Sequence, residues 1–128
     1  MINPELTQRE KVIWDSITQE QIDVIEFYVE IYTDRWPECE LDDAFRDHEA
    51  TEYLLEQQIP IWETITAHQQ LLFLTVVRSF IALNFEEMRI MWYTDDPQFT
   101  NYFNYTTFAV KQVFSRMKSK LNFKFLTK

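Results

Sequence analysis

Apolar side chains recur every three or four residues along most of the chain, which is the spacing of amphipathic helices. Thr7, Thr18 and Thr66 each stand three residues before a Glu or Gln, the capping-box pattern that begins helices. With the apolar periodicity that follows each signal, these residues predict helices over 8–16, 19–35 and 67–93.

Acidic residues mark the other helix starts. Asp42 or Asp43 can cap a helix that runs to about residue 58, and Asp96 can cap a last helix that ends near residue 119. Residues 61–65 are typical of a brief turn of helix after a proline. The segment 121–125 alternates apolar and polar side chains, so it is compatible with helix, a short strand or a loose arm.

The segment Leu71–Tyr93 is apolar around most of its expected helical circumference. One face carries Leu74, Val77, Ile81, Phe85, Met88 and Trp92, and another carries Leu72, Val76, Phe80, Leu83 and Ile90. A helix that is apolar on several faces is covered by other elements. We therefore expect an all-α fold, a bundle of about five helices around this central helix. No linker or repeat divides the chain, so it forms a single domain over residues 1–128, with 120–128 as a loose or pairing tail.

Composition narrows the functional classes. The chain has 128 residues and no glycine. Phosphate-binding loops, dinucleotide-binding fingerprints, EF-hand loops and GxSxG nucleophile elbows all use glycine where the backbone must turn sharply or approach a ligand closely. The sequence therefore argues against these nucleotide, calcium and hydrolase motifs, and it offers no glycine for tight β-hairpins.

Charge is divided unevenly between the two halves of the chain. Residues 1–63 hold 17 acidic and 4 basic side chains, whereas residues 64–128 hold 4 acidic and 8 basic ones, for a net charge of −9. On the helix predicted over 19–35, five carboxylates fall in one line, here called the acidic stripe: Glu20, Asp23, Glu26, Glu30 and Asp34. Like charges at this spacing repel one another by roughly 0.2–0.5 kcal/mol per pair.

Three interpretations of the acidic stripe stay open. It can be a solvated face that keeps the protein dissolved. It can pair with the basic half of the chain, within the bundle or across a homo-oligomer. It can also dock onto the basic surface of another protein, with nucleic-acid mimicry as the extreme form of such docking.

Aromatic residues are abundant, with 4 Trp, 6 Tyr and 11 Phe. On the last predicted helix, one stripe can pack against the central helix: Phe99, Phe103, Thr106, Val110, Phe114, Met117 and Leu121. Tyr102, Tyr105 and Phe108 lie off this stripe, and exposed aromatic patches usually mark partner surfaces. These three residues predict self-association as a homodimer. Basic and aromatic residues together also suit single-stranded nucleic acid, but the net charge of −9 opposes binding to a phosphate backbone.

The two histidines do not fit a di-iron bundle. Neither His48 nor His68 is preceded, three residues earlier, by the Glu that such a site requires. His48 and Glu52 are four residues apart and could share one face of a predicted helix, with Glu49 and Glu56 nearby, so these four residues are weak candidates for a single divalent-metal site. An ion pair on the helix surface accounts for the same spacing.

A small apolar ligand is a further alternative. Trp62, Phe73 and Trp92 could line a pocket between helices, where ligand sites of bundles occur, although core packing explains the same residues. The serines show no neighbouring base or oxyanion hole that would indicate a nucleophile. We expect neither a cofactor nor catalytic activity.

The cysteine content favours a reducing compartment. Cys39 is the single cysteine and lies between Glu38 and Glu40, which disfavour its thiolate. It cannot form an intramolecular disulfide, and the first residues lack a basic and then apolar signal segment, so we expect a cytoplasmic protein. The most apolar stretch, Leu71–Phe85, contains Arg78 and is shorter than the roughly 18 residues of a membrane-spanning helix.

Together these features predict a non-catalytic protein–protein interaction or regulatory module. Its acidic stripe would bind a protein with a basic surface, and its last helix would join two copies. The alternatives are a helical bundle that binds a small apolar ligand or a divalent metal, and a nucleic-acid mimic or nucleic-acid-associated protein.

Overall fold

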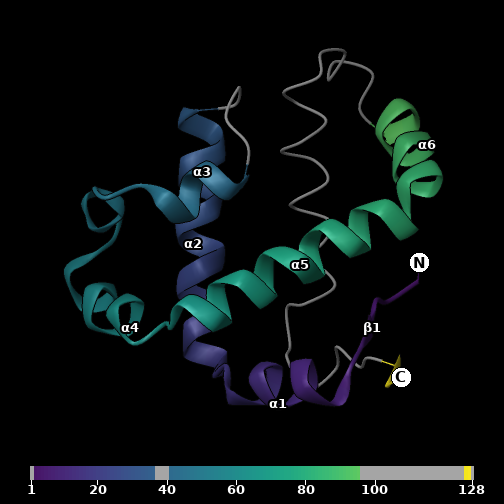
Figure 1. Ribbon diagram of the computed structural model, residues 1–128. Coiled ribbons are helices and arrows are strands. Elements are labelled where there is room, and N and C mark those ends of the chain that lie inside the picture. Colours follow the sequence, from purple (N-terminus) through teal and green to yellow (C-terminus); the bar gives the residue numbers. More distant parts are fainter. Residues whose placement is uncertain (1, 37–40, 96–125, 128) are drawn as a thin grey trace.

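A computed structural model describes residues 2–36, 41–95 and 126–127, and Figure 1 shows how their helices are arranged. Along the chain the elements are β1 (Glu5–Leu6), α1 (Gln8–Ser16), α2 (Gln19–Arg35), α3 (Leu41–Arg46), η1 (Ala50–Tyr53), η2 (Glu56–Gln58), α4 (Ile59–Glu63), α5 (Ala67–Leu83), α6 (Phe85–Asp95) and β2 (Leu126–Thr127). The elements η1 and η2 are short 3₁₀ helices. Helices dominate the described residues, so the expected all-α fold is confirmed.

Three of the predicted helix starts are present as capping boxes. The hydroxyl oxygens of Thr7, Thr18 and Thr66 each accept a hydrogen bond of 3.1 Å from the backbone N–H three residues later. In return, the side-chain oxygens of Glu10, Gln21 and Gln69 each accept one of 2.9 Å from the capping threonine's N–H. These reciprocal bonds satisfy amides that a helix start would otherwise leave unpaired. The bounds predicted for α1 and α2 are confirmed.

The cap of α5 gives the first testable prediction. We expect Thr66→Ala to lower the free energy of unfolding by about 1 kcal/mol, because the backbone N–H of Gln69 loses the Thr66 hydroxyl oxygen as its acceptor. Urea denaturation followed by circular dichroism measures this change. A loss below about 0.3 kcal/mol would show that water replaces the threonine hydroxyl without penalty.

The helix expected from Asp42 or Asp43 to about residue 58 is wrong, because α3 ends at Arg46. The Asp47 carboxylate accepts a hydrogen bond of 2.8 Å from the Glu49 backbone N–H, and the Asp47 carbonyl accepts one of 3.3 Å from Ala50. A short aspartate side chain that binds nearby amides in this way competes with helical hydrogen bonds. The chain therefore turns after α3 and continues as η1 and η2.

The long central helix expected to run to Tyr93 is also wrong, because α5 ends at Leu83 and α6 begins at Phe85. The break lies at Asn84, whose side-chain amide donates a hydrogen bond of 2.8 Å to the Phe80 carbonyl. Asparagine commonly competes with the helix backbone through such bonds. On the C-terminal side of the break, Phe85 and Ile90 are exposed rather than buried as the pattern predicted.

The helix α5 nevertheless occupies the middle of the described structure. It contacts α1, α3 and α6, whereas α2 contacts α3, η1 and α4. Figure 1 shows α5 running across the molecule, with α6 at its far end. The strand β1 pairs in parallel with β2, with Glu5 opposite Leu126, so this pairing brings together residues near both ends of the sequence.

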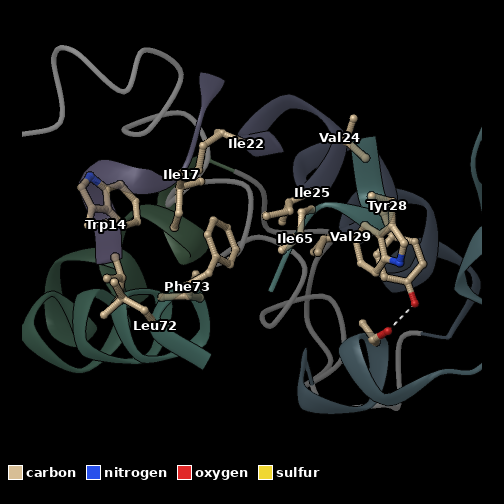
Figure 2. Close-up of a cluster of buried hydrophobic side chains, with 14 of the residues drawn as sticks. Trp14, Ile17, Ile22, Val24, Ile25, Tyr28, Val29, Ile65, Leu72 and Phe73 are labelled. Carbon is tan, nitrogen blue, oxygen red and sulfur yellow. Dashed lines mark hydrogen bonds between the residues drawn. The ribbon is translucent and has the colours of Figure 1, made fainter. Parts of the chain in front are cut away.

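The main core is formed by apolar residues of α1, α2 and α5 and of the segments between helices. Figure 2 shows Trp14 and Ile17 beside Phe73 and Leu72. In the same view, Ile25 and Ile65 lie between this group and Tyr28. All of these side chains are buried. Because apolar burial is the dominant favourable term in folding, this cluster fixes the positions of the surface helices.

Aromatic rings extend the core toward α3 and α4. The ring centroids of Tyr28 and Trp62 are 4.6 Å apart, and Phe45 stacks on Trp62 at 6.0 Å with an interplanar angle of 15°. Phe45 also lies 6.0 Å from Phe73. Trp62 and Phe73, which were candidates for an apolar ligand pocket, are therefore occupied in core packing with other rings.

Several predictions fall outside the described residues. They are the helix over 97–119 with its start at Asp96, the segment 121–125, and the cysteine at position 39. The side chain of Trp92, the third candidate for the apolar pocket, is outside them too.

Candidate functional site

The acidic stripe lies on the side of α2 that faces away from the core. The opposite side of the helix is buried and consists of Gln21, Ile22, Val24, Ile25, Tyr28, Val29, Tyr32 and Thr33. Of the five stripe carboxylates, Glu20, Asp23 and Asp34 are exposed, whereas Glu26 and Glu30 are half-buried. The amphipathic pattern of α2 therefore places all five on one accessible face, as the spacing predicted.

Most basic side chains that the structure describes pair with acidic residues outside the stripe. Lys11 pairs with Asp15 at 3.7 Å, and Arg89 pairs with Glu86 at 2.9 Å. Arg46 lies 3.6 Å from the Asp42 carboxylate on α3, which also binds Arg78 of α5. None of these ion pairs reaches the stripe.

In the part of the chain that the structure describes, most of the stripe carboxylates therefore have no basic partner. Within the described residues, Glu20, Asp23, Glu30 and Asp34 form no ion pair with a basic side chain. The Asp23 carboxylate accepts one hydrogen bond of 3.0 Å from the uncharged side-chain amide of Gln19. Glu26 is not included in this set, because it interacts with another residue. A line of carboxylates without counter-charges creates a negative potential that attracts basic surfaces.

An aromatic pair lies at the C-terminal end of α2. The Trp36 indole N–H donates a hydrogen bond of 3.1 Å to the Tyr53 hydroxyl, which joins the end of α2 to η1. The Arg35 guanidinium lies 5.7 Å from the Trp36 ring centroid and 5.5 Å from that of Tyr53. Arg35 is thus engaged in cation–π contacts with these rings, although it directly follows Asp34 in the sequence.

Tyr28 connects α2 to α3 through a buried hydrogen bond. Its phenol donates to the Ala44 carbonyl, which Figure 2 marks with a dashed line. Burial raises the pKa of Tyr28 well above its ordinary value of 10.0, and the negative charge of Asp47 raises it further. The phenol therefore stays protonated and acts as a structural donor that holds α3 against the helix carrying the acidic stripe.

The raised pKa predicts a loss of stability in alkali. Because the folded chain holds the Tyr28 proton more tightly than the unfolded chain, its contribution is complete below about pH 10 and falls as the pH rises through the folded-state pKa. We expect the free energy of unfolding to decline more steeply above about pH 10 in the wild type than in Tyr28→Phe. Denaturant titrations across this range measure both slopes, and parallel slopes would contradict the prediction.

The candidate metal residues are not assembled into a site. His48 lies in the turn after α3, Glu49 precedes η1, Glu52 belongs to η1 and Glu56 to η2, so they do not share one helix face. In the part of the chain that the structure describes, no three His, Cys, Asp or Glu side chains come close enough together to hold a metal ion. The cause is the turn at Asp47, which breaks the expected helix.

The residues predicted for self-association, Tyr102, Tyr105 and Phe108, lie outside the described residues, so the homodimer stays a prediction. Among the described helices, none combines the length and apolarity needed to span a bilayer.

Sequence reasoning missed two features. One is the cation–π contact of Arg35, whose only sequence signal is a basic residue followed directly by Trp. The other is a contact between Asn84 and the N-terminal segment, 82 positions apart, which no local pattern reports.

Comparisons with protein families, curated proteins and solved structures give no match for this chain.

Proposed function

We propose that this protein is a non-catalytic interaction module, active in the cytoplasm, in which the acidic stripe of α2 binds a basic surface of another protein. The observation that supports this proposal most is the lack of ion pairs, among the described residues, for Glu20, Asp23, Glu30 and Asp34. Support for self-association comes from the aromatic surplus of the last predicted helix, at Tyr102, Tyr105 and Phe108.

The energetics of α2 favour an external counter-charge. Like charges spaced three or four residues apart on an exposed helix cost roughly 0.2–0.5 kcal/mol per pair. A basic partner removes this repulsion and gains favourable pairings, and the field of the stripe would also steer its approach. Such binding weakens as salt rises, because exposed charges are screened beyond about 8 Å at physiological ionic strength.

The proposal is tested by reversing charge on the stripe and, separately, off it. Asp23→Lys with Asp34→Lys changes two exposed stripe positions. Glu49→Lys with Glu52→Lys is the matched control, because it makes the same change in net charge at exposed positions on and beside η1. Thermal melts first establish that both variants fold.

Capture from a native extract at low salt then compares the three proteins. We expect proteins retained by the wild type and by the η1 control to be lost from the stripe variant. If the stripe variant retains the same proteins as the control, the stripe is a solvated face without a docking role, and the proposal is wrong.

A further inference from the structure

An apolar groove of about 540 Å³ lies between the N-terminal segment and the last turns of α5, and it is lined by Ile2, Asn3, Pro4, Glu5, Ser79, Ala82 and Leu83. Ligand pockets of proteins typically measure roughly 300–1,000 Å³ and combine apolar walls with few polar groups. The groove fits this description, because aliphatic side chains and a proline supply most of its chemistry. It is separate from the acidic stripe of α2.

The N-terminal wall of the groove is held in place by Asn84. The Ile2 backbone N–H donates a hydrogen bond of 2.5 Å to the Asn84 side-chain oxygen, and the Asn84 amide donates one of 2.7 Å to the Ile2 carbonyl. Asn84 is 3% exposed. Farther along the same segment, Pro4 and Leu6 are buried and anchor its other end. The wall is therefore formed before any ligand arrives, which lowers the entropic cost of binding.

Two large aliphatic side chains remain exposed on this fixed frame. Ile2 of the N-terminal segment is 59% exposed and Leu83 of α5 is 48% exposed, and both line the groove. Because covering apolar surface is favourable by roughly 25 cal/mol per Å², an alkyl chain placed between them would gain from both walls.

The charge of the groove indicates which head group an alkyl ligand would carry. Among the described residues that line the groove, Glu5 is the single charged one, and the chain as a whole has a net charge of −9. The Glu5 carboxylate would attract an ammonium head group, whereas it would repel a carboxylate head group. We propose that the groove binds an aliphatic amine, with its chain between Ile2 and Leu83 and its ammonium group near Glu5.

The test uses three ligands of equal chain length: decylamine, decanol and decanoate, each below its micelle concentration. Isothermal titration calorimetry on the full chain measures the affinities. We expect saturable binding at one site, with decylamine tightest and decanoate weakest. In Glu5→Gln, decylamine should weaken about two- to fivefold, which corresponds to an exposed ion pair of up to about 1 kcal/mol, while decanol should not change.

A second variant tests the location. Ala82→Phe places a large ring in the groove at an exposed position and should abolish binding of all three ligands. Leu55→Ala, at an exposed apolar position away from the groove lining, is the control and should leave binding intact. Equal binding by Ala82→Phe and wild type, or no saturable binding at all, would overturn the site. Equal affinity for decylamine and decanol would overturn the assignment of an amine.

Discussion

We expect Phe73→Ala to lower the free energy of unfolding by about 3–5 kcal/mol, the typical cost of removing a buried phenylalanine ring. Phe73 is 0% exposed and lies in the core that joins α1, α2 and α5. Its ring also packs 6.0 Å from Phe45 of α3. The loss would be a large part of the roughly 5–15 kcal/mol that stabilise an ordinary domain.

A residue two positions earlier on the same helix is the control for this prediction. Leu71 is 60% exposed, so Leu71→Ala should change stability by no more than about 0.5 kcal/mol. Urea denaturation of both variants, followed by tryptophan fluorescence and by circular dichroism, measures the difference. Similar losses in the two variants would mean that α5 is not packed with Phe73 toward the core.

The second large effect is expected at Asn84, where Asn84→Ala should cost about 2–4 kcal/mol. The substitution removes three side-chain hydrogen bonds, each worth roughly 0.5–1.5 kcal/mol net: one from the Ile2 N–H, one to the Ile2 carbonyl and one to the Phe80 carbonyl. It also frees the N-terminal segment from the junction of α5 and α6. Amide exchange should therefore become faster at residues 2, 3, 5 and 6, the positions of this segment that carry a backbone N–H.

A double-mutant cycle separates the contributions of Asn84. Ile2→Pro removes the N–H that donates to the Asn84 side chain. If the contact with Ile2 carries much of the effect, the double variant loses less stability than the sum of the single variants. Strict additivity, or a cost below about 0.5 kcal/mol for Asn84→Ala, would contradict the role given to this contact.

Local signals predicted the helix starts well. The capping threonines at positions 7, 18 and 66 lie next to clear apolar periodicity, so the sequence determines where α1, α2 and α5 begin. The errors occurred where a polar side chain competes with the helix. Asp47 turns the chain after α3, and Asn84 separates α5 from α6. Both residue types also occur inside helices, so their presence in the sequence did not mark these two positions as breaks.

The candidate site was likewise predictable from local spacing only in part. The acidic stripe could be predicted because helical spacing alone places five carboxylates on one face. Its lack of ion pairs within the described residues could not, because pairing depends on where α3 and α5 direct Arg46 and Arg78. The metal candidates could not be judged from spacing either, because the predicted helix that joined them does not form.

The most direct test of the central proposal is whether the acidic stripe stays outside the interface when two copies of the chain form a dimer. Absolute mass by light scattering during size exclusion, at low and at high salt, gives the answer. We predict a dimer of the same mass at both salts, because an apolar aromatic interface is not screened and leaves the stripe free for a basic partner. A dimer that dissociates at high salt would contradict the proposal, because the acidic and basic halves would then pair between chains and consume the stripe.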